Sequence, residues 1–138
     1  MAKLSMSVEV GASADKVWPV VGDFTGLDRW HPAVERCDAN NGTAGSTRDL
    51  HLAGGGLIRE RLESVDEEGQ SLTYVILESP LPVQDYVSTL RVRGDGGRCT
   101  VEWSSEFEPA GLPEPEAVKT MEGVYKAGLD NLKTMFGA

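Results

Sequence analysis

The chain has 138 residues, a length that suits a single domain spanning 1–138. Its hydrophobic content of 40% and charged content of 25% are ordinary for a globular domain with a core. The net charge of −9, from 13 basic and 22 acidic residues, disfavours binding to phosphate backbones and anionic lipid. We therefore expect no nucleic-acid partner. We also expect no stable membrane insertion, because the sequence lacks a run of 18 apolar residues.

The N-terminal part predicts one strand and two short helices. Apolar residues alternate over 3–10, which is the period of a strand. Ser13 can cap a helix that follows, but Pro19 removes an amide donor and favours a short or kinked helix. A second short helix is predicted over 23–30, where the apolar residues fall on one side.

Six further strands and one long helix are predicted after residue 33. Turn-forming segments separate strands over 34–39, 46–52, 57–66, 71–79, 84–93 and 98–108. Residues 113–136 carry apolar side chains at spacings of three and four, which predicts an amphipathic helix of about five or six turns. Strands linked by hairpins form an antiparallel sheet, and only this last helix is long enough to cover its apolar face.

Two glycines interrupt the apolar pattern of the last helix. Gly123 and Gly128 each cost about 1 kcal/mol relative to Ala inside a helix. They are expected where the helix leaves space for a cavity or where it packs closely on the sheet. The sequence leaves both explanations open.

The tight turn before the last strand predicts one pairing register. Asp-Gly at 95–96 is typical of a two-residue hairpin loop. This loop pairs Leu90 with Val101 and Ser88 with Trp103, as neighbours on one face of the sheet. The face that holds Trp103 is apolar and is expected to point inward.

A second turn, at 53–55, places Arg48 opposite Glu60 on the inward face of two other strands. Alternation along 71–79 adds Glu78 to that face. The inward polar set predicted in this way is Arg48, Glu60, Glu78, Tyr86, Ser88 and Ser105. A buried unpaired charge is costly, so either Arg48 and Glu60 form a structural ion pair or the face lines a cavity. The cavity explains the whole set.

Metal, cofactor and disulfide motifs are missing from the sequence. Cys37 and Cys99 are isolated and are expected as free thiols in a reducing cytosol. The N-terminus lacks an apolar signal core, so a cytoplasmic location is expected. Neither His31 nor His51 has the spacing of a metal site with the cysteines, and no phosphate loop or nucleophile motif occurs. We expect no cofactor and no metal.

Several segments resemble one known family: VWPVVGDFTGLDRWHPAV, GSTRDLHLAGGGLIRERLESVD, YVILESPLPVQDY, TVEWSSEFEP and GLDNL. Over nearly the whole chain they resemble the polyketide cyclase/dehydratase and lipid-transport group of the START-like (birch pollen allergen-like, SRPBCC) superfamily, and are similar to MxaD-type proteins. The resemblance implies an α+β helix-grip fold. In this fold a curved seven-stranded antiparallel sheet wraps a long C-terminal helix, two short helices lie between strands 1 and 2, and a deep apolar cavity lies inside.

Trp30 and His31 are adjacent where the resemblance implies that the cavity opens. Three interpretations of His31 stay open. It is a loop residue bonded to the backbone, a ligand contact at the pocket rim, or a catalytic base. Trp30 is expected in the cavity wall.

Two functions follow from these observations. The first is binding of a hydrophobic or aromatic small molecule, lipid- or polyketide-like, by a monomer or weak homodimer. The second is a cyclase or dehydratase with Glu60, Tyr86 or His31 as acid or base and Arg48 stabilising an enolate. The missing catalytic motif favours binding. The predicted ligand-binding residues are Trp30, His31, Arg48, Glu60, Glu78, Tyr86, Ser88, Trp103, Ser105 and Tyr125.

Overall fold

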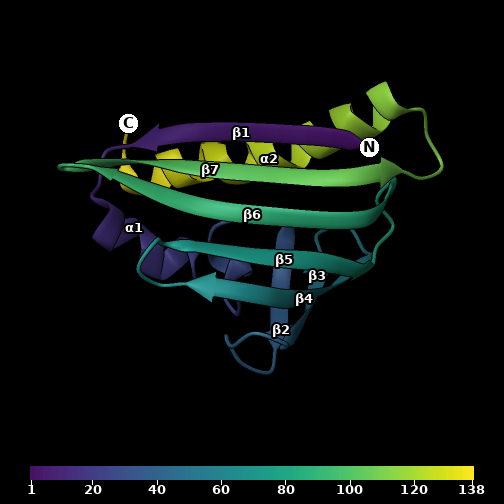
Figure 1. Cartoon of the computed structure of the whole chain (residues 1–138), viewed down its shortest axis with the longest axis horizontal. Helices are drawn as coiled ribbons and strands as arrows, with labels where there is room; N and C mark the ends of the chain where they lie inside the picture. The colour runs from purple at the N-terminus through teal and green to yellow at the C-terminus, as the bar shows by residue number, and fades with distance from the viewer.

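Seven antiparallel strands form one sheet in the order β1-β7-β6-β5-β4-β3-β2. The computed structural model describes the backbone of residues 1–138 and all side chains except that of Asp95. Figure 1 shows the long helix α2 behind β1 and β7, with β2 running across the direction of β4 and β5. The elements are β1 (Ala2–Val10), α1 (Ala14–Val21), a 3-10 helix (Leu27–Arg29), β2 (Val34–Ala39), β3 (Thr47–Leu52), β4 (Leu57–Asp66), β5 (Ser71–Glu78), β6 (Val83–Asp95), β7 (Arg98–Pro109) and α2 (Glu114–Phe136). The predicted helix-grip fold is confirmed.

The region between β1 and β2 is helical, as predicted, but only one of its two helices is an α-helix. Pro19 lies inside α1, which is eight residues long. The second predicted helix is a single 3-10 turn at Leu27–Arg29. Leu27 of this turn is buried, and so are Phe24 before it and Trp30 directly after it. These side chains belong to the buried core of the protein.

The β6–β7 hairpin corrects one predicted register. Asp95 pairs with Arg98, so the two-residue loop is at 96–97 and the predicted loop at 95–96 is wrong. Leu90 consequently pairs with Trp103. The error amounts to two positions in the partner strand, which leaves every side chain on its predicted face because side chains alternate with a period of two.

The β3–β4 register is confirmed, and the position predicted for Glu78 is wrong. Arg48 pairs with Glu60 as the turn predicts. On the other side of β4, a bulge pairs Arg59 with Glu78 and Glu60 with Ile76. The extra residue in β5 turns Glu78 to the outer face, where it is exposed. Glu78 therefore does not belong to the inward polar set.

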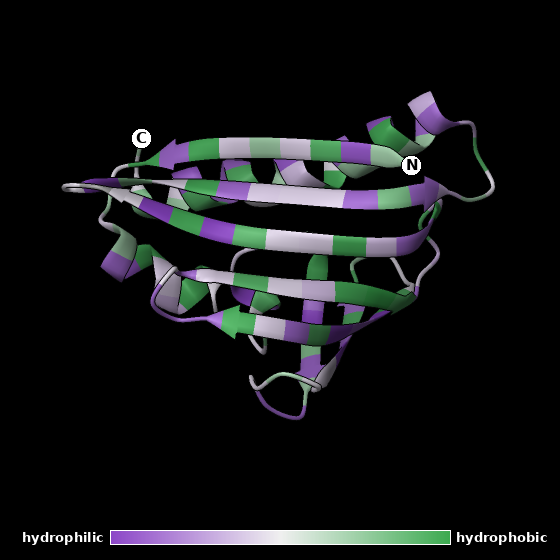
Figure 2. Cartoon of the chain, in the orientation of Figure 1, coloured by the Kyte–Doolittle hydropathy of each residue, from purple (hydrophilic) through white to green (hydrophobic). Residues whose placement is uncertain are grey.

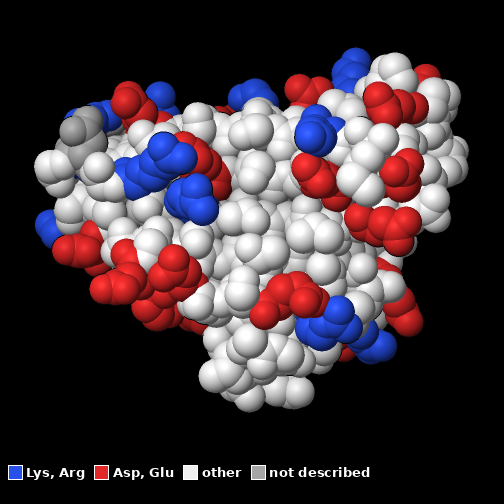
Figure 3. Space-filling model, viewed as in Figure 1, with Lys and Arg blue, Asp and Glu red and all other residues white. Residues whose placement is uncertain are grey.

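The two faces of the sheet differ in composition. In Figure 2 apolar and polar residues alternate along the strands, and most of the apolar ones belong to the buried core. On the face seen in Figure 3, basic groups lie beside acidic ones instead of forming a single patch. Arg59–Asp49 and Arg61–Glu63 are examples of such surface ion pairs. None of the helices in the described part of the chain has both the length and the apolar character to cross a membrane.

Candidate functional site

A cavity of about 180 Å³ lies between the concave face of the sheet and α2. Most of its wall is apolar and includes Leu50, Ile58, Ile76, Met121 and Val124. The polar residues that line it are His31, Glu60, Tyr74, Tyr86 and Trp103. The cavity is smaller than the several hundred Å³ that small-molecule pockets usually have. The physical reason is that large aromatic side chains fill much of the interior, with Trp103 stacked on Tyr125 at 4.2 Å between ring centroids.

The ion pair of Arg48 and Glu60 crosses the inner face of β3 and β4. Arg48 is 3% exposed and Glu60 is 4% exposed. The Arg48 Nε donates a hydrogen bond to Glu60 Oε1 at 2.8 Å, and Nη2 lies 2.7 Å from the same oxygen. Nη1 donates to the Phe24 carbonyl at 2.8 Å, and the guanidinium lies over the Phe24 ring. Arg48 is thereby held from two sides.

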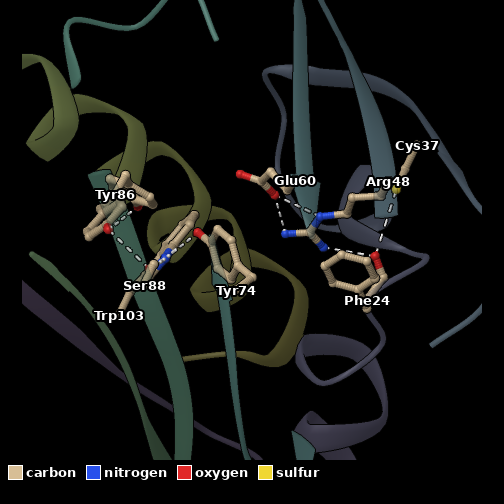
Figure 4. A network of polar contacts seen from close by, with 9 residues as sticks. Phe24, Cys37, Arg48, Glu60, Tyr74, Tyr86, Ser88 and Trp103 are labelled. Carbon is tan, nitrogen blue, oxygen red and sulfur yellow. Dashed lines mark hydrogen bonds and ion pairs between the residues drawn. The ribbon is translucent and has the colours of Figure 1, made fainter. Parts of the chain in front are cut away.

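Glu60 uses only one of its carboxylate oxygens in this pair. Figure 4 shows the other oxygen pointing away from Arg48. Because Glu60 also lines the cavity, this second oxygen is available to a molecule inside it. Burial raises the pKa of Glu60, and the charge and hydrogen bond of Arg48 oppose that rise. The ion pair therefore stabilises a carboxylate in an apolar wall.

A second group of hydrogen bonds joins the three tyrosines, Ser88 and Trp103 (Figure 4), and its Tyr74 ring lies 5.1 Å from the Arg48 guanidinium carbon. Trp103 Nε1 donates to the Tyr74 hydroxyl at 3.1 Å and to Ser88 Oγ at 3.0 Å. Ser88 in turn donates to the Ser104 carbonyl at 2.9 Å. Tyr125 contacts Ser88 Oγ at 3.3 Å and also forms a short hydrogen bond with Tyr86.

The three tyrosines of this hydrogen-bond network are neutral. Burial raises the pKa of Tyr74, Tyr86 and Tyr125, because a phenolate is poorly solvated in the interior. Each of them therefore keeps its hydroxyl proton at neutral pH. They are hydrogen-bonding groups in this site, and none is a ready base.

His31 is hydrogen-bonded to the backbone through both ring nitrogens. Its Nδ1 accepts from the Ala33 amide at 3.1 Å, so Nε2 carries the proton and donates to the Val124 carbonyl at 2.7 Å. Burial lowers the pKa of His31, which favours this neutral form. The geometry supports the first interpretation, a loop histidine bonded to the backbone. One edge of its ring still contributes to the cavity wall.

Trp30 lies behind the cavity wall instead of in it. Its ring packs on Trp103 at 5.5 Å between centroids and is fully buried. A Cβ on Gly128 would lie 2.8 Å from His31 Cδ2 and 2.9 Å from Trp30 Cζ3, so only glycine allows this approach. Around Gly123, by contrast, the space is open. Close packing therefore explains Gly128, and neither explanation applies to Gly123.

The structure brings together most of the predicted site residues, in two layers. Those that line the cavity are His31, Glu60, Tyr86 and Trp103. Arg48, Ser88 and Tyr125 lie behind them and bond to them. Ser105 is buried and its hydroxyl has no hydrogen-bond partner among the described residues. No group of three or more potential metal ligands occurs among the residues whose side chains are described.

Tyr74 lines the cavity and was not among the predicted site residues. It is 2% exposed and accepts the hydrogen bond of Trp103. Its position was readable from the sequence, because it shares the inward parity of Leu72 along β5. A buried tyrosine hydroxyl needs a hydrogen-bond partner, so an inward tyrosine in the sequence indicates a polar contact inside the protein.

A curved antiparallel sheet closed by a long helix over an internal cavity defines a helix-grip domain. The chain belongs to the polyketide cyclase / dehydrase and lipid transport family, whose model matches residues 1–137.

Solved structures and a plant relative agree with this assignment. XoxI from Bacillus cereus is 33% identical and superposes with a TM-score of 0.93, covering 99% of this chain and 96% of that one. MLP-like protein 423 from Arabidopsis thaliana is 26% identical over 129 residues, which are 84% of this chain and 83% of the relative. Norcoclaurine synthase from Thalictrum flavum, in complex with dopamine and hydroxybenzaldehyde, is 25% identical with a TM-score of 0.71, over 97% of this chain and 85% of the synthase.

Proposed function

We propose that this protein binds a hydrophobic small molecule in the cavity between the sheet and α2. The observation that carries the proposal is an apolar wall interrupted by a few fixed polar groups, which is the usual composition of a small-molecule site. The family description, which includes lipid transport, supports it. So does the norcoclaurine synthase structure, in which a related fold holds small aromatic molecules.

The state of the polar groups favours binding over catalysis. Both nitrogens of His31 are engaged by the backbone, so it has no free lone pair with which to accept a proton. Arg48 is paired with Glu60 at 2.7 Å, and this pairing opposes the rise in the Glu60 pKa that burial causes. A cyclase or dehydratase activity is the second candidate, and the cavity-facing oxygen of Glu60 is the observation that favours it.

Titration with toluene, followed by NMR chemical shifts, tests the binding proposal. Toluene is expected to shift the resonances of cavity residues and to stabilise the folded state against heat. Val124→Phe adds a ring at the cavity wall and is expected to abolish both effects. Val118→Phe makes the same change on α2 at a half-buried residue outside the cavity wall, and is expected to preserve both. No uptake by the folded wild type, or equal loss in both variants, contradicts the proposal.

A further inference from the structure

Counting hydroxyl protons gives a direction to each hydrogen bond of the tyrosine–serine chain. A hydroxyl has one proton and two acceptor positions. Ser88 gives its proton to the Ser104 carbonyl, so its oxygen accepts from Trp103 and from Tyr125. Because the Tyr125 proton goes to Ser88, the Tyr86 hydroxyl donates to Tyr125.

This count leaves one proton of the tyrosine–serine hydrogen-bond chain without an acceptor. Tyr74 accepts from Trp103 Nε1 and cannot return a proton to that nitrogen, which is a donor only. Ser88 Oγ is the one acceptor in the described part of the chain that lies in hydrogen-bond contact with the Tyr74 O–H, and Trp103 and Tyr125 already occupy its two acceptor positions. The Tyr74 side chain is buried and lines the cavity, so its free proton is available to a molecule inside.

The cavity also holds one unused acceptor. Glu60 Oε1 takes the contacts from Arg48, and no donor among the described residues bonds the second oxygen. In its ion pair with Arg48, Glu60 is a carboxylate, and the second oxygen of a carboxylate accepts and does not donate. Glu60 and Tyr74 line the same cavity, one with a free acceptor and the other with a free donor. A single hydroxyl group, which both donates and accepts, is complementary to the two.

The size of the cavity limits what can carry that hydroxyl. An apolar cavity of about 150 Å³ accommodates benzene. The cavity here is about 180 Å³, so a single six-membered ring with one small substituent fills it. Aromatic walls at Tyr74, Tyr86 and Trp103 suit a flat ring, through edge and stacking contacts.

We infer that the ligand is a single-ring compound bearing one hydroxyl group, phenol in the simplest case. In this arrangement the hydroxyl donates to Glu60 and accepts from Tyr74. The inference rests on the proposed function, binding of a hydrophobic small molecule in this cavity, and narrows its ligand class. The small cavity volume selects against fused-ring and long-chain molecules, which need more space.

Phenol and toluene form the matched pair that tests the inference. They have nearly the same shape, and phenol has a hydroxyl where toluene has a methyl group. Phenol is expected to bind the wild-type protein about tenfold more tightly, by calorimetry or NMR titration, because two hydrogen bonds form. If toluene binds and phenol binds no better, the hydroxyl site is wrong while the proposed function stands. If neither binds, the proposed function itself fails.

Tyr74→Phe isolates the donor. The variant keeps the ring, and Trp103 Nε1 retains its hydrogen bond to Ser88, so folding is preserved. Phenol is expected to bind about fivefold more weakly, and toluene with unchanged affinity. Thr73→Val is the control, because Thr73 is the neighbouring residue and its hydroxyl bonds Thr89, away from the cavity wall. An equal loss of phenol binding in both variants overturns the assignment.

Two further ligands test the acceptor and the size. Benzaldehyde can accept from Tyr74 but has no proton for Glu60, and is expected to bind more weakly than phenol. 2-Naphthol has the hydroxyl and one ring too many, and is also expected to bind more weakly. Tighter binding of benzaldehyde overturns the role given to Glu60, and tighter binding of 2-naphthol overturns the size limit.

Discussion

Two ion pairs occupy consecutive positions across the same two strands, yet their surroundings are opposite. Arg48 pairs with Glu60 and Asp49 pairs with Arg59 between β3 and β4. The side chains of Arg48 and Glu60 are 3% and 5% exposed, and those of Arg59 and Asp49 are 42% and 33% exposed. The strand pleat sends neighbours to opposite faces, so one pair faces the protein interior and the other faces water.

The contrast shows that an ion pair takes its role from its environment. Water solvates Arg59 and Asp49 whether or not they meet, so their pairing contributes little to stability. Arg48 and Glu60 have no such alternative, because removing either one leaves a buried charge without a partner. The inner pair is therefore strongly coupled, and it leaves one oxygen free to face the cavity.

The largest expected effect is on the inner pair. Arg48→Met removes the cation and leaves Glu60 buried and unpaired, which is expected to cost about 3–5 kcal/mol of the free energy of unfolding. Arg59→Met on the outer face is expected to change stability only slightly. Chemical denaturation of both variants measures the difference. Equal losses would contradict the contrast between the two faces.

Replacing both members of the inner pair is expected to restore most of that loss. In Arg48→Met/Glu60→Met neither charge is left alone, and buried pairs replaced by apolar residues of similar volume are often neutral in stability. The four proteins of the double-mutant cycle give the coupling energy directly. A double variant as unstable as the sum of the single variants would show that the pair is not coupled.

The helix α2 repeats the contrast with its two glycines. At Gly128 a Cβ would meet His31 Cδ2 at 2.8 Å, so Gly128→Ala is expected to lose about 1–3 kcal/mol by overpacking. Gly123 is exposed with open space around its Cβ position, so Gly123→Ala is expected to gain about 1 kcal/mol from helix propensity. Thermal or urea unfolding measures both, and a gain at residue 128 would contradict the close packing.

The smallest expected effect is on the pH dependence of stability. The carboxylates of Glu60 and Asp49 contribute to it in opposite directions. Burial raises the pKa of Glu60 above its usual value near 4.5. The contribution of Glu60 to the free energy of unfolding is therefore present in acid and is lost as pH rises through the folded-state pKa. The hydrogen bond from Arg59 lowers the pKa of Asp49 below its usual 3.8, so its contribution is present above that value and lost as pH falls.

The variants Glu60→Gln and Asp49→Asn separate these two contributions. The stability of the wild type minus that of Glu60→Gln is expected to decrease as pH rises above the usual carboxylate value of 4.5. The corresponding difference for Asp49→Asn is expected to increase from acid to neutral pH. Urea unfolding at a series of pH values measures both, and slopes of the same sign would contradict the assigned environments.

Local pattern was enough for the antiparallel sheet, for the long helix that covers it and for the inner ion pair. Alternation with a period of two places Arg48 and Glu60 on the inward face, and a short turn sets their register, so both facts are contained in neighbouring residues. The apolar spacing of 113–136 likewise predicts α2 to within one residue. The resemblance to a known family supported the prediction of a cavity, which secondary-structure propensity alone does not provide.

Only the tertiary structure decided how the site is completed. The bulge that turns Glu78 outward depends on how β5 pairs with β4, and no pattern within 71–79 reveals it. The tautomer of His31 is set by the Val124 carbonyl, which lies 93 residues away in sequence. The free proton of Tyr74 follows from where Trp103 and Ser88 meet. Strand alternation is a property of neighbours along the chain, whereas cavity volume and hydrogen-bond partners depend on elements that only folding brings together.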